Sequence, residues 1–233
     1  MDRILPSRFA VLVSGLLVTT FSATRADIPL PAITVTGSTP VGDMVYRDRQ
    51  QRSRDVHWPA AISKFVDISE IFAHNEIDIN ASPETVWNHL VQAKLWPQWC
   101  SFVKKVKIWG NSEALEKGTQ FWWKAYDLPQ EGFAVPGAGV VYPDPLSSKI
   151  FECVPESRLG WRSYGAMSVH GTVCETYHYW LLTPIGPKKT RVLFEEVAEG
   201  GAAGFARGNH PEIVHVSHQQ WLEELKKVSE TKS

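Results

Sequence analysis

Apolar and polar residues form regular patterns from residue 71 almost to the end of the chain. They alternate between Ile71 and Ile79, which predicts a strand with one buried face. A helix is expected to begin at Ser82 and Pro83, because serine caps helix N-termini and proline fits the first turn. A second, short helix is expected over residues 95–99. The apolar stripe of the first helix consists of Val86, Trp87, Leu90 and Val91.

Strands dominate the remainder of the pattern. They are predicted at 103–109, 119–126, 150–154, 159–164, 172–183 and 191–198. A Gly- and Pro-rich insert at 128–145 is expected to be a long loop with one short extended piece at 139–142. The glycines between Gly200 and Gly204 are interpreted as a flexible link that ends the sheet. The last element is a helix from about 211 to 228, whose apolar face carries Val214, Trp221, Leu222, Leu225 and Val228.

This order of elements predicts the α+β class. An antiparallel sheet of about six to seven strands cannot stay flat, because strands twist and coil. We expect it to curve around the apolar face of the last helix, while the two short helices after the first strand close one end. The gap between the sheet and the last helix is then the expected ligand pocket.

The first 26 residues have the features of a secretory signal. Arg3 and Arg8 give a basic start, and the apolar run from Phe9 to Phe21 is too short to span a bilayer. Small residues before Ala26 suit cleavage. We therefore expect export to the periplasm or the medium, with no membrane span after signal removal; an uncleaved anchor is the alternative.

Residues 27–70 are expected to form an irregular N-terminal extension. Its charged run from Arg47 to Asp55 mixes both signs, which is typical of a solvated segment. We expect the extension to pack on the following domain through Trp58, Ile62 and Phe65.

Composition excludes some functions. The chain has 43% hydrophobic and 21% charged residues and a formal net charge of −1, which suits a globular protein and gives no basis for binding nucleic acid. Ten tryptophans are many for 233 residues. They suit either the walls of a ligand pocket or the filling of a wide sheet. The three cysteines, at 100, 153 and 174, have no metal or redox spacing and are expected to be buried, inert thiols.

Several segments resemble one superfamily in the right order. The run 77–87 (IDINASPETVW) resembles the opening of START-like, or SRPBCC, domains, and 117–124 (KGTQFWWK) resembles their third strand. The segments 155–161 (PESRLGW) and 177–184 (YHYWLLTP) are similar to later strands, as are 190–192 (TRV) and the pair Glu195-Glu196. Residues 217–225 (SHQQWLEEL) resemble the closing helix. The similarity is strongest to the polyketide cyclase/dehydrase and lipid-transport branch.

This resemblance implies a helix-grip domain over residues 71–228 that holds a hydrophobic small molecule. The superfamily includes lipid carriers, hormone receptors and aromatic polyketide cyclases, which share a cavity and little chemistry. The signal, the N-terminal extension and the insert at 128–145 depart from the branch. The insert is either a lid at the pocket mouth or an ordinary surface loop.

Two residues are candidates for proton transfer. Glu195 and Glu196 are adjacent on one strand and must point to opposite faces; Glu196 shares its face with Val192 and Phe194 and is therefore expected to point inward. An apolar cavity would raise its pKa and suit it to general acid–base catalysis. The alternative is a salt bridge to an arginine, Arg162 or Arg191.

His178 is the second candidate. It shares a face with Trp180, so it can move a proton or orient a ligand carbonyl. It is equally well explained as a hydrogen-bonded core residue. Tyr164 is the third candidate catalytic residue, because its hydroxyl can polarise a carbonyl.

Ligand contacts are expected from large aromatic and basic side chains on the same strands and the last helix. Arg162 can hold a carboxylate, and the aromatic rings supply apolar surface. Alternation alone does not decide which strand face points inward. The candidates are Trp122, Trp123, Lys124, Trp161, Arg162, Trp180, Phe194 and Trp221.

No metal or other cofactor is expected. His210, His215 and His218 are close together in the sequence, but no carboxylate or cysteine completes a standard ligand set nearby. No phosphate-binding loop and no nucleophile elbow is present.

Two functions remain. The first is an exported binding protein for a hydrophobic or aromatic small molecule; the second is a cofactor-free cyclase, dehydratase or lyase acting on a polyketide-like or aromatic substrate. A paired Arg162 and Glu196 would favour binding. An unpaired Glu196 within reach of His178 would favour catalysis.

Overall fold

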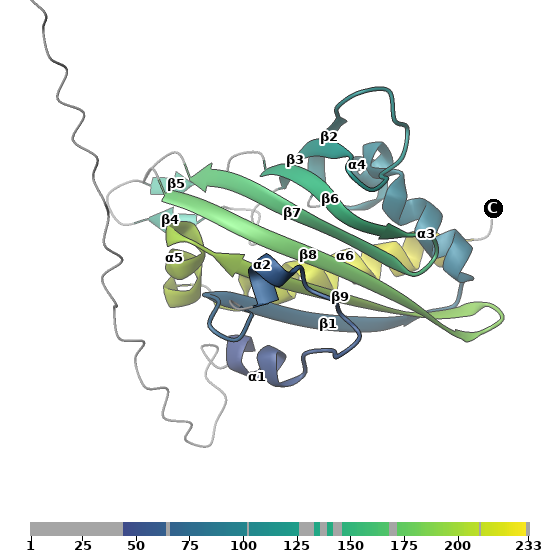
Figure 1. Cartoon of the computed structure of the whole chain (residues 1–233), viewed down its shortest axis with the longest axis horizontal. Helices are drawn as coiled ribbons and strands as arrows, with labels where there is room; N and C mark the ends of the chain where they lie inside the picture. The colour runs from purple at the N-terminus through teal and green to yellow at the C-terminus, as the bar shows by residue number, and fades with distance from the viewer. Residues whose placement is uncertain are drawn as a thin grey trace, which may run out of the picture. The chain divides into compact units, whose positions relative to one another are not determined.

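A seven-stranded antiparallel sheet forms the centre of the structure, a computed structural model (Figure 1). The structure describes residues 44–63, 66–101, 103–125, 133–135, 139–141, 146–167, 172–209 and 211–231. The expected signal at 1–26, residues 27–43 of the extension and most of the insert lie outside these ranges, as do Phe65 and His210.

The strands of the large sheet lie in the order β1-β9-β8-β7-β6-β3-β2. Their bounds are β1 Ile71–Ile79, β2 Val103–Ile108, β3 Gln120–Ala125, β6 Leu146–Val154, β7 Arg158–Met167, β8 Thr172–Gly186 and β9 Lys189–Glu199. Each is at or near a predicted strand, and the helix-grip class is confirmed. Within the insert, β4 (Phe133–Val135) pairs with β5 (Gly139–Val141). β5 corresponds to the extended piece that was predicted at 139–142.

Helices cover the inner, concave face of the sheet. The long helix α6 (Ile213–Glu230) packs on β1 and β9, and α3 (Pro83–Val91) and α4 (Trp96–Trp99) pack beside it. A short turn of 3-10 helix, η2 (Ala93–Leu95), joins α3 to α4. The predicted cap is present, because the Ser82 hydroxyl accepts a hydrogen bond from the Thr85 backbone N–H, with Pro83 in the first turn.

The N-terminal extension covers part of the outer face. Two helices, α1 (Met44–Gln50) and α2 (Ala60–Ser63), correct the expectation of irregular structure in this part of it. Trp58 and Ile62 pack on the outer side of β1, β8 and β9, as predicted. The outward residues of β9 are therefore buried as well as the inward ones, and burial is continuous from Val192 to Ala198.

The glycine-rich segment after β9 is not a flexible link. Residues Gly201–Asn209 form helix α5, which packs on β8 and β9. Gly200 makes the turn between β9 and α5 with φ of 101°, a backbone conformation that favours glycine. A Cβ atom at this position would overlap the carbonyl oxygen of Val173 on the neighbouring strand.

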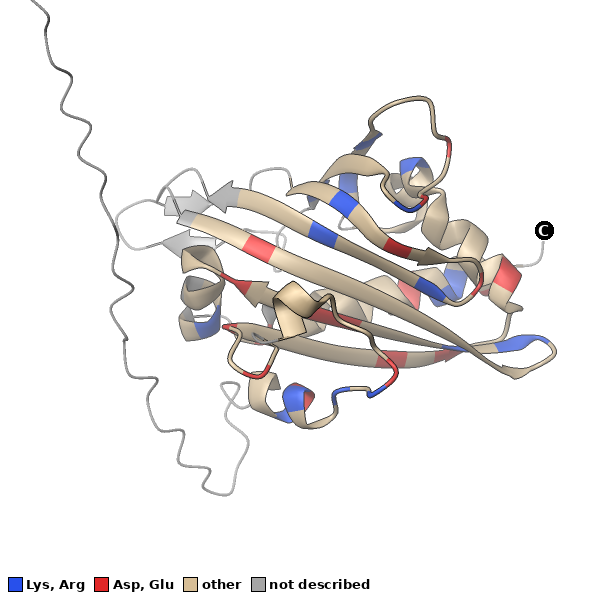
Figure 2. Cartoon of the chain, in the orientation of Figure 1, with Lys and Arg blue, Asp and Glu red and all other residues tan. Residues whose placement is uncertain are grey.

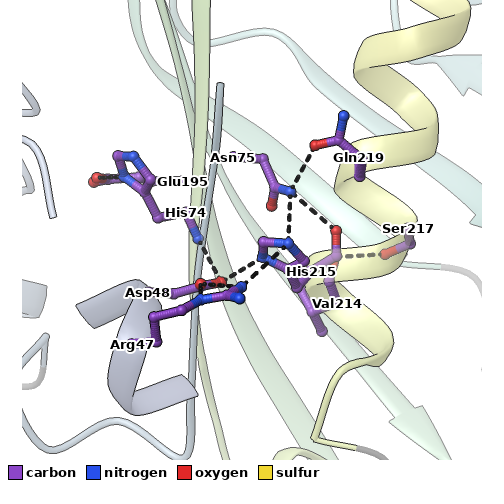
Figure 3. A network of polar contacts seen from close by, with 9 residues as sticks. All are labelled: Arg47, Asp48, His74, Asn75, Glu195, Val214, His215, Ser217 and Gln219. Atoms are coloured by element: carbon purple, nitrogen blue, oxygen red, sulfur yellow. Dashed lines mark hydrogen bonds and ion pairs between the residues drawn. The ribbon is translucent and has the colours of Figure 1, made fainter. Parts of the chain in front are cut away.

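The buried side chain of Asp48 connects α1 to the rest of the domain (Figure 3). Its carboxylate accepts hydrogen bonds from the His74 backbone N–H at 3.1 Å and from Arg47, and it lies 2.6 Å from Nδ1 of His215 on α6. The expectation of a solvated charged run is therefore wrong at Asp48, which is fully buried. Two of its partners, His74 and His215, lie far away in the sequence.

Surface charge gives no large field of one sign in Figure 2, where acidic and basic residues are interspersed along the strands and helices. Within the described residues, no helix has both the length and the apolar character needed to cross a membrane.

We predict that Asp48→Ala lowers the free energy of unfolding by about 3 kcal/mol, because it leaves the partly buried imidazole of His215 and the backbone N–H of His74 without their acceptor. Urea denaturation measures this change, and Asp55→Ala, at an exposed position, is the control. Equal stability of the two variants would show that Asp48 does not hold α1 in place.

Candidate functional site

His178, Glu196 and His218 meet on the inner face of the sheet. Trp161, His178, Glu196 and Ala73 form one register row across β7, β8, β9 and β1. Oε2 of Glu196 lies 3.0 Å from Nδ1 of His178 and 2.8 Å from Nε2 of His218, which reaches down from α6. We call these three residues the His–Glu–His cluster. All three are almost completely buried.

The His178 ring is held by contacts on two sides. Its Nε2 lies 2.9 Å from the Thr176 hydroxyl, and its face stacks on the Trp161 ring at a centroid distance of 4.8 Å. Its Nδ1 is close to the Glu196 carboxylate but is not aligned for a hydrogen bond with it. The ring is therefore fixed by Thr176 and Trp161, and Nδ1 is left available.

The His218 ring stacks on Phe194 at a centroid distance of 3.6 Å. Its Nε2 is directed at Glu196, while its Nδ1 is buried without a hydrogen-bond partner among the described residues. Trp221, three residues later on the same face of α6, packs on Phe194 and Trp180. The apolar contact of Trp221 thus sets the position of His218 over the sheet.

The buried carboxylate of Glu196 stays ionised. Burial alone would raise its pKa, but the nearby imidazoles of His178 and His218, and the hydrogen bond with His218, outweigh that effect and lower the pKa to about 2. Burial also lowers the pKa of His218, so protonation of this second imidazole is disfavoured. The expected rise of the Glu196 pKa is wrong, because two imidazoles contact the carboxylate and only one of them, His178, was expected within its reach.

A row of small hydroxyl side chains lies next to the cluster. Ser148, Ser163, Thr176 and Ala198 are register neighbours on the inner face of β6, β7, β8 and β9. The Ser148 and Ser163 hydroxyls lie 2.8 Å apart, and Ser148 accepts a hydrogen bond from Nε1 of Trp123. We call Ser148, Ser163 and Thr176 the hydroxyl row; it puts short polar groups where the adjoining rows carry large rings.

Aromatic rings fill the interior around the cluster. They include Trp96, Phe121, Trp123, Trp161, Trp180, Phe194 and Trp221, which lie in mutual contact. The Nε1 atoms of Trp161 and Trp180 are buried without hydrogen-bond partners in the described part of the chain. Five of the predicted ligand-binding residues thus face inward and pack in the core between the sheet and α6: Trp123, Trp161, Trp180, Phe194 and Trp221.

Four of the predicted site residues lie on the outer face of the sheet, away from the His–Glu–His cluster. Arg162 pairs with Glu175 at 2.8 Å on the outer face, and Tyr164 is 49% exposed on the same side. Trp122 and Lys124 alternate with the buried Trp123 and also point outward; Lys105 lies over the Trp122 ring. Alternation places these residues away from Glu196, so the direct roles expected for them in an internal pocket are not supported by their positions.

Arg162 and Tyr164 do line a pocket of their own. It has a volume of about 390 Å³ and lies with Trp109 and Lys149 across β6 and β7. The alternative partners of Glu196 are also excluded, because Arg191 pairs with Asp78 at 2.9 Å. Neither arrangement that was expected to separate binding from catalysis is therefore present. Glu196 is within reach of His178 and has no arginine partner, but it is paired with two imidazoles.

His218 is the residue that sequence reasoning missed. It was considered only beside His215 as a metal ligand, yet His215 binds Asp48 instead. The available signal was helical spacing: His218 precedes Trp221 by three residues, and the inward direction of Trp221 was predicted.

Comparison with known proteins agrees with this architecture. The family described as polyketide cyclase / dehydrase and lipid transport matches residues 73–230, more than half of the chain. None of the curated proteins matches the sequence significantly. A hypothetical protein from Helicobacter pylori is 19% identical with a TM-score of 0.61, and the match covers 76% of this chain and 98% of that one.

Two solved enzymes are also similar. The aromatase/cyclase from Streptomyces sp. R1128 is 12% identical with a TM-score of 0.52, covering 68% of this chain and 93% of its own. A truncated norcoclaurine synthase from Thalictrum flavum is 14% identical with a TM-score of 0.50, covering 70% and 94%. Identities this low show the fold alone. The resemblance to START-like proteins is confirmed.

We predict that Glu196→Gln lowers the free energy of unfolding at neutral pH by about 3 kcal/mol, because a buried amide cannot replace the charged acceptor beside His178 and His218. The wild-type protein should also lose this contribution as the pH falls from about 5 to about 2, since the carboxylate is protonated first in the unfolded chain. The variant should show a weaker dependence over that range.

Urea denaturation at several pH values, in chelator-treated buffer, makes the measurement. Glu116→Gln, at an exposed position, is the control. Parallel pH profiles for wild type and Glu196→Gln would contradict the assigned electrostatics.

Proposed function

We propose, from the premise that the chain belongs to the polyketide cyclase/dehydrase and lipid-transport family, that it binds a hydrophobic or aromatic small molecule between the sheet and α6. The observation that carries this proposal is the change of character along the inner face. Along β8 and β9 the large rings of Trp180 and Phe194 are followed by the His–Glu–His cluster and then by Thr176 of the hydroxyl row. This arrangement suits a ligand with an apolar body and a carbonyl or hydroxyl group.

The hydroxyl row is the proposed position of the ligand's polar group. Ser163 is fully buried and Thr176 nearly so, yet their side chains are short, so the sheet is lined there by backbone and hydroxyl groups. The large rings around the cluster already fill their part of the interior. A ligand lying over the hydroxyl row would gain affinity mainly from burial of its apolar surface, at about 25 cal/mol per Å².

Catalysis is the second candidate, and the His–Glu–His cluster favours it. A cyclase, dehydratase or lyase needs a group that accepts a proton and one that returns it. Glu196 and His178 are 3.0 Å apart and fixed by packing, and Arg162 is not involved. The fold alone does not imply this chemistry, because related folds support both carriers and enzymes.

Export is part of the same proposal. The basic start, the short apolar run and the small residues within 1–26 support a secretory signal. A carrier or enzyme in the periplasm or the medium would meet its ligand outside the cytoplasm.

The first experiment is native mass spectrometry of the protein purified from its own host, with extraction of any bound compound. We predict a stoichiometric hydrophobic or aromatic molecule. Ser163→Leu should weaken its rebinding roughly tenfold or more, because the added side chain takes up space over the hydroxyl row. Ser147→Leu, at an exposed position on the outer side of β6, is the matched control.

Thermal unfolding of both variants checks that each remains folded. Equal binding by Ser163→Leu and Ser147→Leu would place the ligand elsewhere, and absence of binding to the wild-type protein would remove the proposal. Incubation of the extracted compound with the protein then separates the two candidates. A carrier leaves it unchanged, whereas an enzyme converts it and Glu196→Gln abolishes the conversion.

A further inference from the structure

We propose that His178, Glu196 and His218 form a binding site for a divalent transition-metal ion. Nδ1 of His178, Nε2 of His218 and a carboxylate oxygen of Glu196 all lie within 4.8 Å of one another. Two imidazoles and one carboxylate are a ligand set that zinc and iron(II) use in proteins. The three residues come from β8, β9 and α6, elements that are packed together in the core.

The directions of the donor atoms support the site. Nδ1 of His178 is 3.0 Å from Oε2 of Glu196 but is not aligned to share a hydrogen bond with it. Nε2 of His218 approaches the same oxygen to 2.8 Å. The hydrogen bond in the cluster lies between Glu196 and His218, and Nδ1 of His178 takes part in none among the described residues, whereas a metal ion would be bonded by all three donor atoms.

The Thr176 hydroxyl orients the His178 ring so that Nδ1 can bind a metal ion. When Nε2–H of His178 donates to the Thr176 hydroxyl at 2.9 Å, Nδ1 carries the lone pair and faces Glu196. Hydrogen bonds of this kind to the remote nitrogen commonly fix the tautomer of metal-binding histidines. Stacking on Trp161 and Phe194 holds the two rings of the cluster in place.

Charge favours a cation at this point. Glu196 is buried, and the side chains that contact its carboxylate among the described residues are the two imidazoles. Neither Arg162 nor Arg191 reaches it, because each pairs with another carboxylate. A divalent ion would supply the balancing charge in a region of low dielectric constant.

Three protein ligands leave a coordination position open, as in catalytic zinc sites. A ligand oxygen at this position would be polarised by the ion. The neighbouring hydroxyl row provides a polar surface beside the cluster. Metal binding itself does not depend on the proposed small molecule, so it is tested without one.

The experiment uses the full chain without a histidine tag and Co²⁺ as a spectroscopic probe, followed by calorimetry with Zn²⁺. Because the cluster is buried, Co²⁺ is added to the native protein and, separately, during refolding from urea. We predict one Co²⁺ per chain with the visible absorption of a low-coordinate nitrogen and oxygen site. Glu196→Gln and His218→Gln should each weaken binding by about 100-fold or more, and Thr176→Val by about 10- to 100-fold.

His215→Gln is the matched control, since it removes a histidine from the same helix that contacts Asp48 and not the cluster. Circular dichroism in the presence of a chelator verifies that each variant is folded. If Glu196→Gln is too unstable to measure, His218→Gln alone tests whether the cluster binds the ion. Absence of stoichiometric Co²⁺ in both preparations overturns the proposal. Binding that survives the cluster variants, or that is lost in His215→Gln, overturns it as well by placing the ion elsewhere.

Discussion

The burial of an ionised carboxylate at Glu196 is the constraint on which the inner half of the structure depends. A charge at this depth requires close partners. His178 supplies one from the neighbouring strand, but the other, His218, belongs to α6. Since Trp221 follows His218 by almost one helical turn and packs on Trp180, the polar and apolar contacts require the same rotation of α6. The position of α6 on the sheet is therefore specified both by the polar contact of His218 with Glu196 and by the apolar packing of Trp221.

β9 carries a second buried carboxylate on its other face. Glu195 accepts a hydrogen bond from the Ser53 backbone N–H at 2.7 Å and lies 2.8 Å from Nδ1 of His74. Adjacent glutamates are thus buried on opposite sides of one strand, each beside histidine. Asp48 then connects α1 to β1 and to His215 of α6, so the extension is tied to both layers by polar contacts. This explains why the extension belongs to the folded unit although its sequence lacks regular periodicity.

Local patterns were sufficient for most of the fold. The Ser82 cap, the alternation in β1 and the apolar stripe of α6 depend on residues close together in the sequence. Alternation also predicted the inward direction of Glu196. The same rule could have corrected the site: Trp161 and Arg162 are adjacent on one strand and cannot both face the interior. The same holds for Trp123 and its neighbours.

What the sequence could not supply were pairings between distant residues. Asp48 stands in a mixed charged run that is usually solvated, and nothing local indicates the buried contact with His215. His178, Glu196 and His218 lie on three elements, with no motif spacing among them. Such clusters arise from strand register and helix packing, which a single sequence does not specify.

The composition of the cluster's own row argues that it serves more than stability. Ile150, Trp161 and Ala73 fill the same row with apolar side chains, and Phe194 and Val192 do so further along β9. An apolar residue at 196 would continue that packing without a desolvation cost. Replacement of buried ion pairs by well-packed apolar groups is often neutral or stabilising. A carboxylate held by two oriented imidazoles, beside the hydroxyl row, is therefore better explained by a bound group than by the requirements of the core.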